Sequence, residues 1–118
     1  DQYHERARLT LHEIQKAGTR QVGHSLVLAE LHGHLLRRLD PASARRIVGG
    51  LMQDSAFEWK DVSTDLITRA MSAWMDRFRD QRFSLTDAVT FELMRELRIS
   101  QAFAFDQDFV TAGFALLT

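Results

Sequence analysis

The sequence predicts an α/β domain in which a short parallel sheet is flanked by helices. Two observations support this prediction. Segments whose apolar residues recur with helical spacing alternate along the chain with short apolar runs that are typical of buried strands. Strands separated by helices are expected to pair in parallel, because a parallel pair needs a crossover connection. Functional side chains in such sheets lie beyond the carboxyl ends of the strands, which indicates where to expect a site.

The amino-terminal half contains three segments with helical spacing of apolar residues. They cover residues 3–17, 28–39 and 42–53. Gly18 can end the first segment, and Asp40-Pro41 marks a break before the third, with proline at the first helical position. The apolar run at residues 26–28, after Gly23, fits either a brief buried strand or the start of the second helix.

The carboxyl-terminal half alternates more regularly between strand and helix. Short strands are expected over residues 57–62, 101–105 and 115–117. Ser63 or Thr64 can cap a helix that runs to about Asp80. Ser84 and Asp87 have the spacing of a capping box, so another helix is expected to begin there.

Composition excludes several classes of protein. The 118 residues suffice for one small domain with a real core, so a single domain over residues 1–118 is expected. The chain has no cysteine, which excludes disulfides, thiolate zinc sites and cysteine catalysis. No apolar run approaches the roughly 20 residues of a membrane helix, and the first residues are polar. We therefore expect a cytoplasmic protein without a signal peptide or a membrane partner.

The net charge does not indicate a strongly basic nucleic-acid binder, because it is −1. Arginines nevertheless form local groups, at positions 37 and 38, 45 and 46, and 77, 79 and 82. Arginine can clamp a phosphate with two donors at once. The ordinary alternative is a solvated helix surface.

Three acidic residues stand apart from the polar helix faces. Glu30 lies inside an apolar stretch, Asp87 lies in the first turn of its expected helix, and Asp106 directly follows an apolar strand. A parallel sheet can bring them to one end, where ionised carboxylates repel one another unless a divalent cation binds between them. A water bound to that cation can attack phosphorus, so the acids suit phosphodiester hydrolysis. Their ordinary interpretations are a helix rim, a cap and a turn, respectively.

Competing sites have weaker support. His32 and His34 are two residues apart and would point to different helix faces, and His4 and His12 are about two turns apart, too far to share a metal. The tryptophans and phenylalanines follow helix or strand periodicity and fit a core better than a base-stacking surface. No glycine-rich phosphate loop or serine-nucleophile motif is present.

Several spaced motifs resemble the PIN-domain family. In the carboxyl-terminal half they are residues 83–91, 94–97, 102–109 and 112–114. The family pattern there is a Ser-x-Thr-Asp helix start, a short strand, an aspartate, and a phenylalanine before a glycine. Upstream, residues 1–7 resemble the first helix of the family, and residues 27–31 resemble its second acidic segment. The resemblance implies a three-layer PIN-like domain with a short parallel sheet flanked by helices.

The resemblance also implies an activity, cofactors and partners. PIN domains are typically endoribonucleases that depend on Mg²⁺ or Mn²⁺, and many bacterial members are VapC-like toxins that form homodimers and are blocked by an antitoxin protein. By motif position, Glu30, Asp87 and Asp106 match the metal-binding catalytic acids of the family. Asp108 is a weaker, auxiliary candidate for the metal. RNA is the implied substrate.

The sequence departs from the family pattern at its start. The family opens with a strand that ends in a metal-binding aspartate, whereas this sequence starts at the following helix, and Asp1 matches the helix start rather than that ligand. The sequence is then trimmed from a longer chain, or completed by another chain, or naturally truncated. We expect a missing amino-terminal stretch. The alternative function is a catalytically weak or inactive PIN remnant that acts as a protein-binding or dimerisation module.

Overall fold

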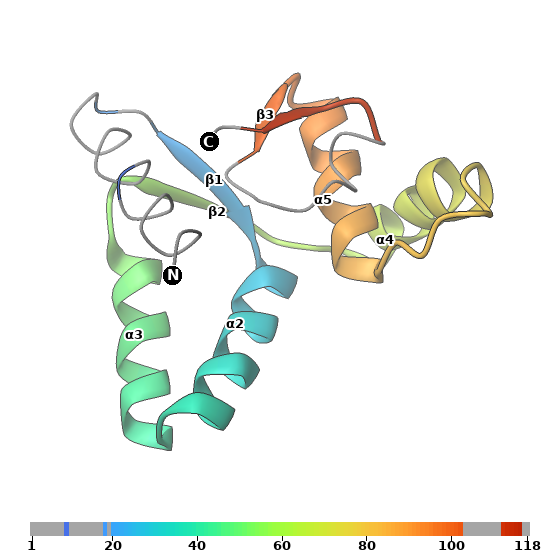
Figure 1. Ribbon diagram of the computed structural model, residues 1–118. Helices are drawn as coiled ribbons and strands as arrows, with labels where there is room; N and C mark the ends of the chain where they lie inside the picture. Colours follow the sequence, from blue (N-terminus) through green and yellow to red (C-terminus); the bar gives the residue numbers. More distant parts are fainter. Residues whose placement is uncertain (1–8, 10–17, 19, 103–111, 117–118) are drawn as a thin grey trace. The chain divides into compact units, whose positions relative to one another are not determined.

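The computed structural model describes residues 9, 18, 20–102 and 112–116 (Figure 1). The elements are β1 (Gln21–His24), α2 (Ser25–Arg38), α3 (Pro41–Gln53), β2 (Phe57–Lys60), α4 (Thr64–Ala70), the π-helix η1 (Met71–Asp76), α5 (Leu85–Glu96), β3 (Gln101–Ala102) and β4 (Ala115–Leu116). The helix expected over residues 3–17 lies outside the described residues. None of the described helices is both long and apolar enough to span a bilayer.

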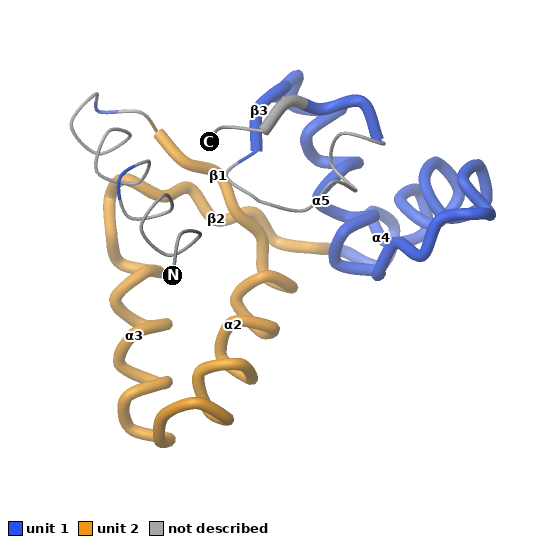
Figure 2. Tube along the Cα trace, in the orientation of Figure 1, with its two compact units in different colours: residues 1–18, 63–118 blue, residues 19–62 orange. Residues whose placement is uncertain are grey.

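The chain divides into two compact units (Figure 2). One comprises residues 19–62, and the other comprises residues 1–18 together with residues 63–118. Both units contain a pair of parallel strands, β1 with β2 and β3 with β4. The α/β class with parallel strands is therefore confirmed. The single domain over residues 1–118 stays a prediction.

The unit of residues 19–62 is a strand–helix–helix–strand motif. Gln21 of β1 pairs with Phe57 of β2, and α2 and α3 form the crossover and pack against each other (Figure 1). The α3 helix starts as the sequence predicts. Asp40 accepts a hydrogen bond from the Ser43 amide at 2.8 Å, and Pro41 follows as the first helical residue. The bonds from Ser43 hold the pKa of Asp40 below its ordinary value.

Trp59 connects β2 to its surroundings within the same unit. Its indole N–H donates a hydrogen bond to the Leu51 carbonyl at 3.0 Å, and its ring stacks on Phe57 with centroids 5.4 Å apart. The ring also lies directly against the backbone of β1, because a Cβ at Gly23 would collide with it. Glycine at this position therefore allows the Trp59 side chain of β2 to lie against the backbone of β1.

The core of the other unit is aromatic. Trp74, Phe83 and Phe91 are buried, and the Phe91 ring lies 5.4 Å from Trp74 and 5.0 Å from Phe83, both in edge-to-face geometry. The other buried apolar side chains of this unit, among the described residues, are Leu66 and Ala70 of α4 and Ala88, Val89 and Met94 of α5. Such edge-to-face pairs are favourable beyond the area that they bury.

Two expected elements differ from the structure. The helix expected to reach Asp80 is α-helical only to Ala70 and then continues as the π-helix η1 to Asp76, which places one more residue in each turn. Met71 in η1 is 39% exposed, because the buried stripe runs through Leu66, Ala70 and Trp74 at a spacing of four.

Strand boundaries give the other comparison. Of the two interpretations left open for the apolar run at residues 26–28, the structure confirms the start of a helix, α2, and a strand lies before it at Gln21–His24. A run of three apolar residues has no periodicity that separates strand from helix. The strand expected over residues 57–62 ends at Lys60. Of the strands expected over residues 101–105 and 115–117, the described parts are Gln101–Ala102 and Ala115–Leu116.

Candidate functional site

Glu30 lies on α2, in the unit of residues 19–62. Its side chain is exposed and lines a cavity of about 590 Å³ together with Val27, Ala29, Leu31, Gly33, His34 and Arg37. The ordinary interpretation of Glu30, a helix-rim position that faces water, is confirmed. An exposed carboxylate that opens into a cavity is also what a ligand-binding acid requires.

His24 is the titratable neighbour of Glu30 in this unit. It ends β1 and is 2% exposed, so it lies at the carboxyl end of a parallel strand. Burial lowers the pKa of His24, and the negative charge of Glu30 acts in the opposite direction. The carboxylate of Glu30 therefore lies within electrostatic reach of the strand end where sites form in such folds.

Asp87 lies in the first turn of α5, in the other unit. It completes a capping box, in which its Oδ2 accepts the Ser84 amide at 3.2 Å and its own amide donates to Ser84 Oγ at 3.1 Å. The ordinary interpretation of Asp87 as a cap is thus confirmed. The cap engages Oδ2, and a carboxylate has two acceptor oxygens, so capping and cation binding are compatible roles.

The donor set of the described acids fits a hard cation. Glu30 is exposed and Asp87 is half-buried, and both present the carboxylate oxygens that Mg²⁺ and Mn²⁺ prefer. Asp106 and Asp108 lie outside the described residues. Within the described part of the chain, no group of three or more Asp, Glu or His side chains is arranged to hold an ion. The metal site that combines these four acids stays a prediction.

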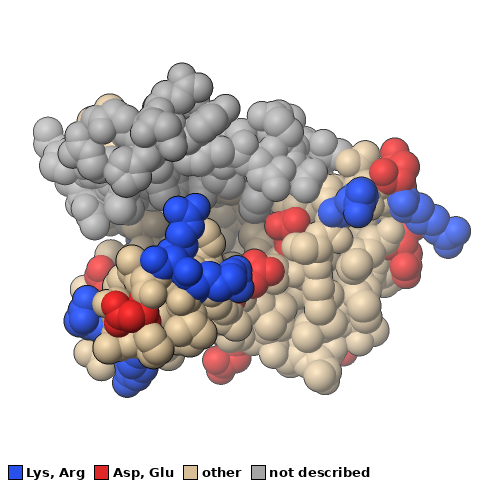
Figure 3. Space-filling model, turned by 60° about the horizontal axis from the view of Figure 1, so that its bottom comes forward, with Lys and Arg blue, Asp and Glu red and all other residues tan. Residues whose placement is uncertain are grey.

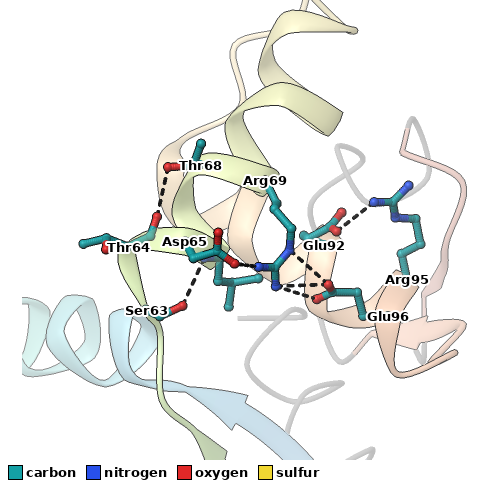
Figure 4. Close-up of polar contacts among 9 residues, drawn as sticks. Ser63, Thr64, Asp65, Thr68, Arg69, Glu92, Arg95 and Glu96 are labelled. Atoms are coloured by element: carbon teal, nitrogen blue, oxygen red, sulfur yellow. Dashed lines mark hydrogen bonds and ion pairs between the residues drawn. The ribbon is translucent and has the colours of Figure 1, made fainter.

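A buried acid that the sequence did not single out lies on α5. Glu92 is 1% exposed, and its Oε1 accepts the indole N–H of Trp74 at 3.1 Å. Its Oε2 pairs with Arg95 at 2.7 Å, and this bond raises the pKa of Arg95 (Figure 4). The three-residue spacing of Glu92 and Arg95 was a signal for the pair. Nothing local indicated the burial, because Trp74 is 18 positions away.

A second group of charges lies beside Glu92 in Figure 4. Arg69 of α4 pairs with Asp65 one turn earlier and with Glu96 of α5, at 3.1 Å to Glu96 Oε1. These contacts join α4 to α5 and are exposed. In both groups the carboxylates form ion pairs with arginines of the same unit, so the charges of Arg69 and Arg95 are paired within the protein.

The arginine groups of the sequence analysis lie on exposed surface. Arg37 and Arg38 end α2, and Arg45 and Arg46 lie on α3. None of these four forms a salt bridge with an acid in the described ranges. On the face drawn in Figure 3, several Lys and Arg side chains adjoin one another and Asp and Glu side chains lie beside them, and the net charge of the chain is −1. Any electrostatic attraction of a polyanion is therefore local.

No family model matches the chain. Over 53 residues it is 42% identical to the 23S rRNA-specific endonuclease VapC20 from two strains of Mycobacterium tuberculosis, a match that covers 45% of this chain and 40% of the relative. The chain thus matches less than half the length of these curated relatives. The crystal structure of M. tuberculosis VapC20, a sarcin–ricin loop cleaving toxin, superposes with a TM-score of 0.77 and 28% identity. That likeness covers 92% of this chain and 82% of the solved chain.

Sequence similarity and superposition lead to the same class of protein, an α/β domain of the PIN type. The two likenesses support assigning the chain to the VapC-like PIN-domain family. This outcome confirms the family resemblance on which the choice of Glu30, Asp87 and Asp106 rests.

Proposed function

We propose that this chain is a metal-dependent endoribonuclease of the VapC type, a toxin that hydrolyses phosphodiester bonds of RNA. The observation that supports the proposal is the likeness to VapC20 in both sequence and structure, because that relative is a 23S rRNA-specific endonuclease. The sarcin–ricin loop that the solved relative cleaves is the substrate to try first.

In this proposal Glu30, Asp87 and Asp106 hold Mg²⁺ or Mn²⁺, with Asp108 as an auxiliary ligand. The support comes from their motif positions and from the oxygen donors that Glu30 and Asp87 present. The cation, when bound, supplies charge neutralisation at the phosphodiester and a more acidic water for its hydrolysis. The role of Asp87 in the cap fixes its carboxylate at the start of α5, which limits the reorganisation needed on binding.

The test is cleavage of a sarcin–ricin loop RNA by the wild-type chain in Mn²⁺, in Mg²⁺ and in EDTA, beside Asp87→Asn. We expect cleavage that requires the metal and falls at least 100-fold in Asp87→Asn, in line with the loss of one metal-positioning group. Ser84→Ala is the matched control, because it breaks the same capping box without removing a proposed ligand. Equal cleavage in EDTA, or equal cleavage by Asp87→Asn, would exclude the mechanism.

The likeness to VapC20 also supports an antitoxin partner, a homodimer and a cytoplasmic location, and we propose all three. Apolar side chains on the α2–α3 hairpin are exposed, which favours protein contacts: Leu36, Leu39, Ile47 and Met52. Light scattering of the purified chain tests the dimer. A second candidate, an inactive PIN remnant that serves as a binding module, predicts the same oligomer without a stoichiometric Mn²⁺ site in calorimetry.

A further inference from the structure

One face of α2 carries a continuous polar stripe that begins at Glu30. Gly33, His34 and Arg37 follow it three, four and seven residues later, so all four residues lie on the same side of the helix. All four also line the cavity of about 590 Å³. The stripe therefore combines the proposed metal-binding acid with two nitrogen donors in one surface hollow.

Arg37 lies back along the helix over Gly33. The Arg37 Nη1 atom is 3.5 Å from the point where a Cβ of residue 33 would stand, so the guanidinium covers the helix one turn before its own Cα. This direction places its donors toward the Glu30 end of the cavity. Arg37 is exposed, and none of the described carboxylates forms a salt bridge with it.

Arg37 lies seven residues after Glu30 on α2, so it does not lie at the position where we expect the phosphodiester to react. Seven residues correspond to about 10 Å along a helix axis, and the backward direction of the side chain shortens that separation. A phosphate bound by Arg37 would thus be a neighbour of the one at Glu30. Guanidinium and phosphate form paired, charge-assisted hydrogen bonds, which Lys or a neutral side chain does not reproduce.

We propose that Arg37, assisted by the imidazole of His34, binds a backbone phosphate of RNA next to the reacting phosphodiester. The identity of the ligand as RNA rests on the proposed function. Both residues position the substrate along α2. Such a contact supplies affinity and register without reading the base sequence.

Matched control residues adjoin both positions. Arg38 is as exposed as Arg37, but it lies about 100° further around the helix and does not line the cavity. His32 lies about 200° from His34 and is also absent from the cavity. Comparing Arg37→Gln with Arg38→Gln, and His34→Gln with His32→Gln, holds the overall charge change and the helix position nearly constant.

The experiment measures the fluorescence anisotropy of a labelled sarcin–ricin loop RNA hairpin in EDTA, so that binding is observed without cleavage. We expect Arg37→Gln to raise Kd about fivefold and to lower the slope of log K against log salt concentration by about 0.7 to 0.9. His34→Gln should raise Kd about two- to threefold, as expected for a single weaker donor. Arg38→Gln and His32→Gln should change Kd less than twofold. Circular dichroism verifies that all four variants fold.

Equal effects of Arg37→Gln and Arg38→Gln would overturn the inference, as would the absence of RNA binding by the wild-type chain. A labelled poly-glutamate peptide serves as the other polyanion. Binding of this peptide that depends on Arg37, with no binding of RNA, would overturn the inference in favour of an acidic protein partner. The cleavage assay with Asp87→Asn tests the proposed function separately. The phosphate contact can therefore fail while the nuclease activity stands.

Discussion

The two compact units bury their apolar side chains to very different degrees. In residues 63–102, three aromatic rings and several aliphatic side chains are buried around Phe91. In residues 20–62, the buried side chains are Ala44 and His24, and large apolar side chains such as Met52 are exposed. The comparison indicates that the unit with the aromatic core has its own source of stability. The α2–α3 unit presents its side chains outward, in the way that binding surfaces do.

Substitutions of apolar residues should therefore lower the free energy of unfolding more in the unit with the aromatic core than in the unit of residues 19–62. Phe91→Ala removes a fully buried ring from the contacts with Trp74 and Phe83, and we expect it to lower the free energy of unfolding by about 3 to 5 kcal/mol. Ile47→Ala on α3, which is 37% exposed, should cost less than about 1 kcal/mol. Urea denaturation measures both. Similar losses for the two variants would contradict the difference between the units.

Two charge pairs of α5 allow a second comparison, within the unit that has the aromatic core. One involves the buried Glu92 and the other the exposed Glu96. Glu92→Ala leaves the buried indole N–H of Trp74 without its acceptor and breaks the pair with Arg95. We expect a loss of about 2 to 3 kcal/mol. Glu96→Ala breaks only the exposed pair with Arg69 and should cost less than about 1 kcal/mol. If thermal or urea unfolding gives equal losses, burial is not what makes the Glu92 pair strong.

Local rules predicted the starts of α3 and α5 well. Asp40 before Pro41, and Ser84 with Asp87, are caps whose partners lie within three residues, so the sequence contains all the information. The position of Glu30 on a helix rim follows in the same way from the surrounding apolar spacing.

Features that depend on distant residues were missed. Glu92 has the sequence context of an ordinary polar helix position, and its burial requires the Trp74 side chain from another helix. The strand Gln21–His24 is polar in sequence, and its pairing with β2 across two helices identifies it. The convergence of Glu30, Asp87 and Asp106 is equally non-local, and it stays a prediction that the likeness to VapC20 supports.

Two glycines of the unit of residues 19–62 test the packing of that unit. Their substitutions should change the free energy of unfolding in opposite directions, and by less than Phe91→Ala changes it. Gly23→Ala introduces a Cβ against the Trp59 ring, and we expect a loss of about 1 to 3 kcal/mol as the ring shifts. Gly50→Ala on α3 meets nothing within 4 Å and should stabilise by about 0.5 to 1 kcal/mol, because alanine favours the helix. Denaturant midpoints of the two variants should shift in opposite directions. A destabilising Gly50→Ala would show that α3 is packed more closely than its exposure indicates.

The smallest expected effect is a pH dependence of stability that arises from His24, whose pKa responds to the proposed metal-binding residue Glu30. Burial lowers the pKa of His24 from its unfolded value near 6.5, so the unfolded state binds more protons and the contribution of His24 to stability is complete above that pH. This contribution is lost as the pH falls through the folded pKa. Glu30→Gln removes the charge that opposes the shift, so NMR titration should find a still lower pKa for His24 in that variant. Asp54→Asn is the control, because Asp54 does not contribute to the shift. An unchanged pKa for His24 in Glu30→Gln would show that the Glu30 carboxylate is directed away from the end of β1.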